Sequence, residues 1–360
     1  MNQLAESTPH CTTARSRAGA AVTYFALILL ASCAVASAQN TAASDAPSSD
    51  ARVTHILGFQ DAPKNSTGRL SIEADDLQFK KGEEDTPLWI KISSIRDFST
   101  GETDKQVGGL PMTAAKAAVP FGGGRAVSLL AHKKYDTVTL EYVDASGGLH
   151  GAIFQLRKGQ TLPEALAAKG VRSAPPEEKG ETATGPAPQI QPATTSSIAD
   201  DARGGRWSVE VQEVDPGEVA IEPAFRIAIY ENLLHEVEKA KTFDQVFRSG
   251  NRAADSVSKL LIFKTTVEKY TAGSETRRAA TTVTGATKIT VRTQLCTRDG
   301  RVVWDQVSGA NVRFMGGNLR VTNKVAHNVG RQMKSPRLDP VLETLDRERP
   351  GSKGSPVAGQ

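Results

Sequence analysis

Cysteine is scarce in this chain, with three residues in 360. Two of them, Cys11 and Cys33, precede residue 39, so Cys296 is the only thiol expected in the body of the protein. A single thiol excludes an intrachain disulfide, and it excludes zinc sites that are built on paired cysteines. The folded part must therefore be stabilised by burial of apolar side chains.

The chain also lacks the patterns of common catalytic sites. No Gly-x-Ser-x-Gly elbow is present, and the zincin-like start at His235 fails because Lys239 stands where the second histidine is needed. His150 and Asp144 flank a glycine-rich stretch that is typical of a turn rather than of a serine-type triad. We expect no enzyme activity, no metal site and no cofactor, and the net charge of +4 does not indicate nucleic-acid binding.

The N-terminus has the features of a secretory signal. Arg15 and Arg17 precede an apolar run at 18–30, and the small residues that follow permit cleavage after Ala38. The sequence Leu-Ala-Ser-Cys ending at Cys33 resembles the lipobox of bacterial lipoproteins, which would make Cys33 the lipidated first residue. Either route predicts an exported protein, periplasmic or anchored to a membrane, for example as an outer-membrane lipoprotein. No later run reaches the roughly 20 apolar residues of a spanning helix.

Composition divides the rest of the chain. We expect a flexible leader at 39–51, a Pro-rich linker at 171–206 and a disordered tail at 334–360, because these stretches contain few large apolar side chains. Two modules remain, at 52–170 and 207–333, and each is long enough for a domain. We therefore predict an α+β protein of two independently folding domains.

The pattern of the first module predicts short strands followed by one helix. The helix is expected at 162–169, after Gly159, and we place Trp89, Phe154 and Leu166 in the core. Short apolar or alternating runs predict the strands at 53–57, 70–73, 77–79, 88–92, 127–130, 138–142 and 152–156. This order predicts a small barrel or sandwich closed by a helix.

Three segments of this module carry a resemblance. Gly68 to Ile72, Ile92 to Ile95 and Gly147 to Phe154 resemble the PH- or GRAM-like modules of some envelope proteins. The resemblance implies a small PH-like β-barrel with a closing helix over 52–170.

The second module mixes both periodicities. A long helix is expected at 222–241, with an apolar stripe that includes Phe225, Ile229 and Leu233. Strands are expected at 207–211, 243–247, 260–270, 287–296 and 302–307, and a last helix at 319–333. Asp299-Gly300 predicts a two-residue hairpin turn between the last two strands. The pattern indicates a mixed α/β sheet domain.

A second resemblance covers this module. The segments that carry it are Ala254-Asp255, Val267 with Tyr270, Gly285 to Arg292 and Asp299 to Trp304. They resemble a family of bacterial envelope lipoproteins that is similar in layout to the TolB N-terminal domain and to the curli secretion lipoprotein. The resemblance implies a domain used for binding or assembly, with no catalytic residue to assign.

The last helix carries one basic face. Arg320, Lys324, His327 and Arg331 recur at helical spacing, opposite in phase to its valines. The simpler interpretation is a solvated face. The alternative is contact with an anionic surface such as lipid head groups or lipopolysaccharide, which makes Arg320, Lys324 and Arg331 the candidate site residues.

These observations favour a non-enzymatic, exported envelope protein that acts as a binding or assembly module. Its partner would be another envelope protein or an anionic lipid surface. Two other functions stay open at this point. One is a hydrolase whose site is built from scattered residues, and the other is a subunit of an export complex. A hydrolase would show a nucleophile and a base within reach of each other.

Overall fold

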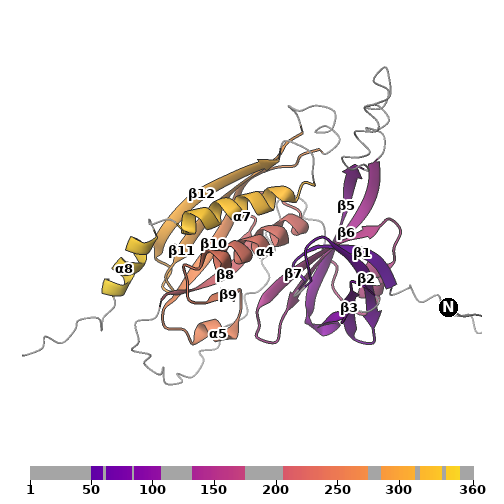
Figure 1. Ribbon diagram of the computed structural model, residues 1–360, viewed down its shortest axis with the longest axis horizontal. Coiled ribbons are helices and arrows are strands. Elements are labelled where there is room, and N and C mark those ends of the chain that lie inside the picture. Colours follow the sequence, from indigo (N-terminus) through magenta and orange to yellow (C-terminus); the bar gives the residue numbers. More distant parts are fainter. Residues whose placement is uncertain are drawn as a thin grey trace, which may run out of the picture. The chain divides into compact units, whose positions relative to one another are not determined.

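The computed structural model describes residues 50–59, 62–82, 85–106, 132–174, 206–274, 285–312, 317–334 and 338–348 (Figure 1). For 102–106 and 132–134 it describes the backbone alone. All of these residues belong to one compact unit, Asp45–Gln360, and they form an α+β structure with two sheets. Cys33, the predicted strand at 127–130 and the linker from residue 175 to 205 lie outside the described residues.

The first sheet has seven antiparallel strands in the order β4-β3-β2-β1-β7-β6-β5. The strands are β1 (Asp50–Leu57), β2 (Ser66–Glu73), β3 (Asp76–Lys80), β4 (Leu88–Lys91), β5 (Ile95–Gln106), β6 (His132–Val143) and β7 (Leu149–Arg157). Within the described residues, β4 and β5 form no ladder with each other, so these pairings do not close a barrel. β5, one of the longest strands, follows the short 3-10 helix Ile92–Ser94 and has no counterpart among the predicted strands.

Alternation along the strands places an aromatic cluster inside this sheet. The rings of Phe59, Phe79 and Phe154 pack around the fully buried His55, with ring centroids 5.5–6.4 Å apart. The predictions of Phe154 and Leu166 as core residues are confirmed. The prediction for Trp89 is wrong, because Leu88 and Ile90 turn toward the core and the indole between them projects outward.

The helix that follows the first sheet is α3 (Leu162–Ala168), as predicted. Pro163 stands in its first turn, and Leu162, Ala165 and Leu166 join the core of the first sheet. The chain then returns along β5, where the Phe98 N–H donates to Arg172 O. Residues 171–174, expected as the start of the linker, are therefore ordered against the first sheet.

The second sheet has five strands in the order β12-β11-β10-β8-β9. The strands are β8 (Ser208–Asp215), β9 (Val246–Arg248), β10 (Leu260–Thr271), β11 (Thr287–Cys296) and β12 (Val302–Val312). β8 pairs in parallel with both β9 and β10, whereas β10, β11 and β12 form an antiparallel meander. The mixed sheet predicted for this module is confirmed.

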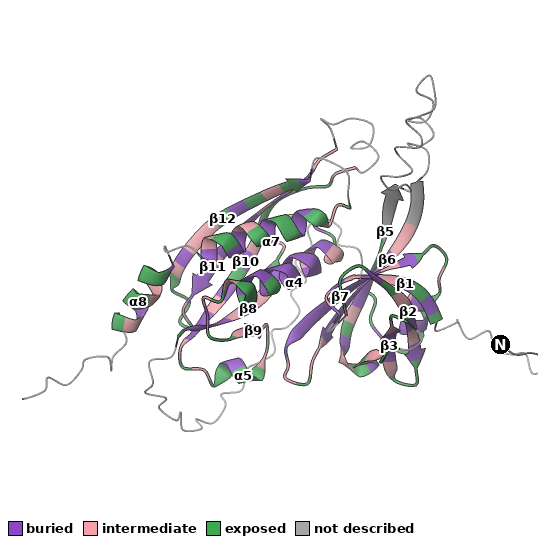
Figure 2. Ribbon diagram, viewed as in Figure 1, coloured by how far each residue is buried: buried purple, intermediate pink, exposed green. Residues whose placement is uncertain are grey.

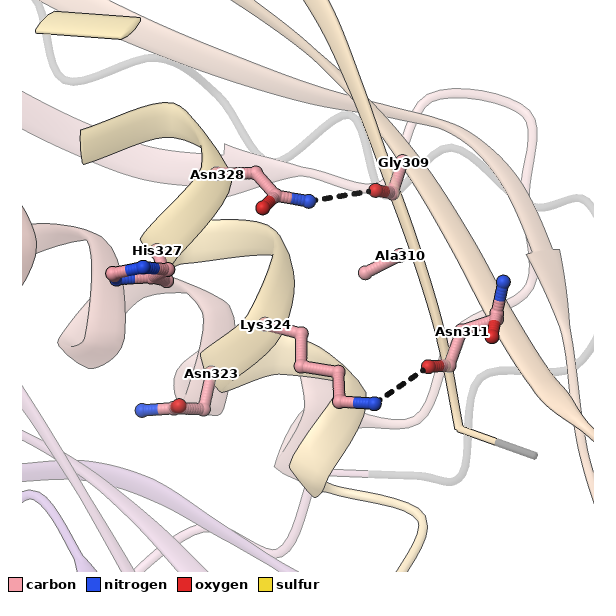
Figure 3. Close-up of a pocket in the computed structure, with 7 residues that line it drawn as sticks. All are labelled: Gly309, Ala310, Asn311, Asn323, Lys324, His327 and Asn328. Carbon is pink, nitrogen blue, oxygen red and sulfur yellow. Dashed lines mark hydrogen bonds between the residues drawn. The ribbon is translucent and has the colours of Figure 1, made fainter. Parts of the chain in front are cut away.

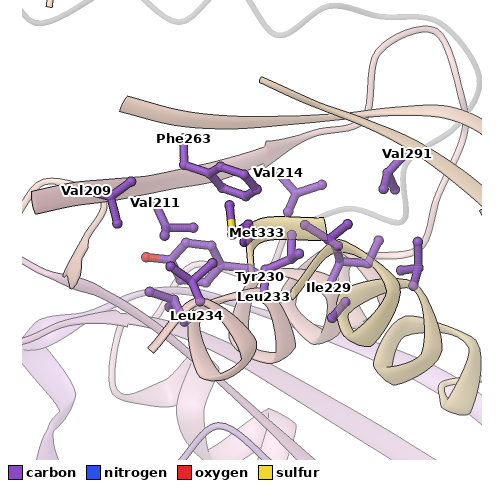
Figure 4. Close-up of a cluster of buried hydrophobic side chains, with 14 of the residues drawn as sticks. Val209, Val211, Val214, Ile229, Tyr230, Leu233, Leu234, Phe263, Val291 and Met333 are labelled. Carbon is purple, nitrogen blue, oxygen red and sulfur yellow. The ribbon is translucent and has the colours of Figure 1, made fainter. Parts of the chain in front are cut away.

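Two long helices cover one face of the second sheet. They are α4 (Pro223–Ala240) and α7 (Arg320–Met333), close to the predicted bounds. Valines of β8 and β11 and Phe263 of β10 meet Ile229, Leu233 and Met333 from the helices (Figure 4). The opposite face of the sheet carries exposed Lys264 and Lys288, as expected for an antiparallel region with one solvated side.

Two local predictions differ from the structure. Between β11 and β12, Thr297 and Arg301 pair and Gly300 has a φ of 88°, so the hairpin has a three-residue loop rather than a two-residue one. The short α5 (Arg252–Asp255) follows β9. Within the tail expected to be disordered, α8 (Asp339–Glu348) forms, and Leu338 and Leu345 are buried in the core of the second sheet.

Candidate binding surface

The last long helix, α7, has two sharply different faces. Val321, Val325 and Val329 are fully buried against the second sheet. Arg320, Lys324, His327, Arg331 and Lys334 are all exposed, and buried and exposed positions alternate along the ribbon (Figure 2). The structure therefore brings the three candidate site residues onto one face of one helix, as their spacing predicts.

Lys324 of this face is engaged within the fold. Lys324 Nζ donates to Asn311 O at 3.1 Å, and Asn328 Nδ2 donates to Gly309 O at 3.0 Å (Figure 3). Both carbonyls belong to β12, the edge strand of the second sheet. Bonded edge carbonyls are a poor template for pairing with another strand. Lys324 thus covers the sheet edge, and Arg331 is a stronger candidate than Lys324 for an external contact.

A buried carboxylate on α4 holds the histidine of this face. Glu236 Oε2 contacts His327 Nδ1 at 3.3 Å, and its Oε1 accepts from Lys239 Nζ at 3.2 Å. Burial acts to raise the pKa of Glu236, but the hydrogen bonds from Lys239 and His327 outweigh it and lower that pKa. Gly330 lets α7 approach this carboxylate, because a Cβ there would lie 2.9 Å from Glu236 Cβ.

The surface is hollowed between α7 and β12, but it does not form an enclosing site. The hollow has a volume of about 350 Å³ and is lined by Gly309, Ala310, Asn311, Asn323, Lys324, His327 and Asn328. Lys324 and Asn328 reach toward β12, whereas His327 and Asn323 point away from it (Figure 3). Within the described part of the chain, no group of three His, Cys, Asp or Glu side chains could hold a metal ion. This geometry suits contact with an extended surface better than capture of a small molecule.

The polar residues around His150 form the turn that the sequence predicts. Asp144 Oδ1 accepts from Ser146 N, Ser146 Oγ and Gly148 N at 2.6–2.9 Å, and Asp144 Oδ2 lies 2.9 Å from His150 Nε2. The Ser146 hydroxyl donates to the carboxylate and not to the imidazole. A serine-type triad needs the opposite order, with the base bonded to the hydroxyl.

Burial sets the charge state of His150, and hydrogen bonds set that of Asp144. Burial, followed by the nearby Arg248, lowers the pKa of His150, so its ring is neutral near pH 7. Burial also acts to raise the pKa of Asp144, but its hydrogen bonds from Ser146, His150 and Gly148 lower it to about 2. Asp144 is thus ionised and organises the turn between β6 and β7.

A buried ion pair joins this turn to the second sheet. Arg248 of β9 bonds both carboxylate oxygens of Glu231 on α4, at 2.7 and 3.0 Å, and it also donates to Leu149 O of β7 at 3.0 Å. Glu231 Oε1 in turn accepts from the Gly151 N–H at 2.9 Å. One charged pair therefore satisfies backbone groups on the neighbouring sheet.

Close apolar packing accompanies this pair. A Cβ at Gly151 would lie 2.3 Å from Ile227 Cγ2, so only glycine allows α4 to approach β7 this closely. Leu57 and Ile153 of the first sheet pack with Ile227 and Ala228 of α4. The sequence patterns did not predict this contact, which we call the α4–β7 junction. The available signal was a second apolar flank on the predicted helix, beside its main stripe.

Two comparisons with known proteins gave no match. No family model matches it, and no curated protein matches it. Within the described residues, no helix combines the length and the apolar character needed to cross a membrane.

The search of solved structures found partial likenesses. The PelC dodecamer from Paraburkholderia phytofirmans is 15% identical, with a TM-score of 0.28, over 36% of this chain and 89% of that chain. A variant of the same dodecamer is 16% identical, with a TM-score of 0.29. A Xanthomonas campestris protein of the DUF330 family is 12% identical, with a TM-score of 0.28, over 40% of this chain and 90% of that chain. Likeness at this level assigns neither an activity nor a partner.

Proposed function

We propose that this protein is a non-enzymatic, exported envelope module that docks on an anionic membrane surface through α7. The observation that carries the proposal is the face of Arg320, Lys324, His327, Arg331 and Lys334, exposed on a helix whose other side is fully buried. The helix is fixed by its valines, so these cations are presented without a folding cost on binding.

Electrostatics favour a surface as the ligand. Each basic side chain near an anionic leaflet contributes about 1 kcal/mol, and the attraction decays within a Debye length. Several cations on one helix therefore give useful binding, although each contact is weak. The chemistry recognised is the phosphate group, which both anionic phospholipids and lipopolysaccharide present.

We also propose that the first sheet with α3 is a PH-like module, and that the second sheet with α4, α7 and α8 is an assembly domain. Seven antiparallel strands followed by one packed helix support the first assignment.

The signal-like N-terminus supports export, with Cys33 lipidated or with cleavage after Ala38. Mass spectrometry of the mature N-terminus distinguishes the two routes, and an intact Met1 would contradict export.

Vesicle sedimentation tests the docking surface. The protein should pellet with phosphatidylglycerol vesicles, less with phosphatidylcholine vesicles, and less again as salt rises. The double variant Arg320→Glu/Arg331→Glu should lose this binding. The matched control Lys264→Glu/Lys288→Glu changes the net charge by the same amount, but on the uncovered face of the second sheet. This control should still bind the vesicles.

A second arm uses vesicles that contain lipopolysaccharide. Preference for these vesicles over phosphatidylglycerol vesicles would identify the source of the phosphate groups. Equal loss of binding in the two double variants would mean that net charge matters and α7 does not. That result would overturn the proposal.

A further inference from the structure

Trp89 is an exposed aromatic residue of the first sheet. It lies on the edge strand β4 and is 65% exposed, whereas Trp207 and Trp304 are both 8% exposed. Its strand neighbours Leu88 and Ile90 pack toward the core, which turns the indole to the outer face of the sheet. An exposed indole held on a paired strand is a rigid apolar plate with a polar edge, the kind of group that anchors ligands.

The ammonium group of Lys91 lies beside the Trp89 indole. Lys91 Nζ lies 5.9 Å from the centre of the Trp89 ring, and Asp76 holds the same ammonium group at 2.9 Å. Lys91 and Asp76 also face each other across β4 and β3. This contact therefore favours one orientation of the indole before any ligand binds.

Polar side chains continue from the indole across the outer face. The strand register places Gln78 opposite Trp89, and Ser71 opposite Gln78. Two residues further along each strand, the register aligns Lys80, Arg69 and Arg52 on β3, β2 and β1. These positions share the outer face, because the residues between them on each strand are buried.

The row of Lys80, Arg69 and Arg52 is unusual in energetic terms. Like charges directly opposite each other on neighbouring strands are destabilising. Asp50 pairs with Arg69 at 3.2 Å, but within the described residues neither Arg52 nor Lys80 has an ion pair. Two cations on a fixed sheet face are thus available to an external anion.

We propose that this outer face binds a linear acidic polysaccharide. A sugar ring stacks its C–H face on Trp89, its hydroxyl groups bond Gln78 and Ser71, and a neighbouring carboxylate pairs with Lys80 and Arg52. The distance from β4 to β1 is three strand spacings, roughly 14 Å, which spans more than one sugar ring. A nucleic acid is less well matched, because successive bases need successive aromatic platforms and the described residues of this face supply one, Trp89. The site is independent of α7 and of the docking proposed there.

Titration of the full chain with a short alginate oligosaccharide tests the proposal. Tryptophan emission should change on binding, since the other two indoles are buried, and calorimetry should give the affinity. Trp89→Ala should weaken binding at least about tenfold. Arg52→Ala/Lys80→Ala should weaken alginate binding by a similar factor and remove the preference for alginate over a neutral cello-oligosaccharide.

The control is Lys264→Ala/Lys288→Ala, which removes two exposed cations from the second sheet and should bind as the parent does. Unchanged thermal unfolding of each variant confirms that its fold is intact. The proposal is overturned if alginate gives no heat and no emission change, or if Trp89→Ala binds as tightly as the parent. It is also overturned if a single-stranded oligonucleotide or phosphatidylglycerol vesicles bind this face while alginate does not.

Discussion

The two sheets of this protein bury their apolar faces in different ways. The first packs its aromatic core between its own strands and α3. The second presents one apolar face and depends on α4 and α7 to bury it. As a result, different surfaces stay open for contacts: the outer face of β1 to β4 in the first sheet, and the outer side of α7 in the second.

Helix α4 packs against both sheets. α4 packs on β8 with Leu233 and Val237, and it meets β7 with Ile227 and Glu231. A helix with apolar residues on more than one side needs a second partner. The α4–β7 junction supplies it, so the independence of the two modules becomes a question of how strong this junction is.

Removal of the buried charge at the junction should have the largest effect. Glu231→Ala leaves Arg248 partly buried without its partner and leaves the Gly151 N–H without an acceptor. Breaking such a pair costs about 3–5 kcal/mol, measured as the loss in the free energy of unfolding in urea. Glu213→Ala, whose side chain is half exposed beside Arg96, is the control and should cost less than about 1 kcal/mol.

Proteolysis in the linker tests whether the α4–β7 junction holds the two sheets together. Cleavage between residues 175 and 205 should yield two stable fragments that co-elute in the parent protein and separate in Glu231→Ala. Fragments of the parent that separate at once would show that the junction contributes little. Resistance of the linker to cleavage would contradict the two-domain prediction.

The closing helix of the first sheet gives the next effect. Leu166 is fully buried, so Leu166→Ala should lower the free energy of unfolding by about 2–5 kcal/mol. Glu164→Ala, on the exposed side of the same helix, should change it by less than about 0.5 kcal/mol. A loss below about 0.5 kcal/mol for Leu166→Ala would mean that α3 is not docked on the sheet.

Sequence patterns predicted elements that are set by local periodicity. The bounds of β11, α4 and α7 follow from their stripes, and the basic face of α7 follows from the same phase. Trp89 was misplaced because an apolar run shows that a strand is buried but not which of its faces is covered. β5 was missed because its residues, Ile95 to Gln106, are largely polar and form a strand through pairing with β6.

The junction could not be predicted for a different reason. Gly151, Glu231 and Arg248 are distant in sequence, and nothing local tells that a glycine faces Ile227 or that a helix carboxylate meets a strand N–H. Likewise, Leu338 and Leu345 in the tail become core residues only because the second sheet offers a place for them. Long-range packing, not propensity, decides such contacts.

A steric test of the junction should give an intermediate effect. Gly151→Ala places a methyl group against Ile227, and overpacking of this kind costs about 1–3 kcal/mol. The matching truncation Ile227→Ala makes room, so the double variant should lose less than the two single variants added together. Strict additivity in urea unfolding would show that the two residues are not in contact.

The smallest predicted effect is a pH dependence of the unfolding free energy that arises in the first sheet. His55 lies in the core of the first sheet, where its Nδ1–H donates to Pro63 O at 3.0 Å and its Nε2 accepts from the Phe59 N–H at 3.1 Å. These partners assign the neutral tautomer. Burial lowers the pKa of His55, only partly opposed by its backbone hydrogen bonds, and burial also lowers that of His150.

The sign of the pH effect follows from the direction of these shifts. A folded-state pKa below the unfolded value near 6.5 means that the unfolded chain binds the proton more readily. Stability from His55 is therefore complete above about pH 6.5 and is lost as the pH falls toward the folded pKa. One such group contributes at most about 1.4 kcal/mol per pH unit.

His55→Gln, whose amide can both donate and accept, should flatten the decline in unfolding free energy between about pH 7 and about pH 5. His235→Gln, at an exposed position of α4, should leave the decline unchanged. Equal pH profiles for His55→Gln and the parent would show that the imidazole is not buried as a neutral ring.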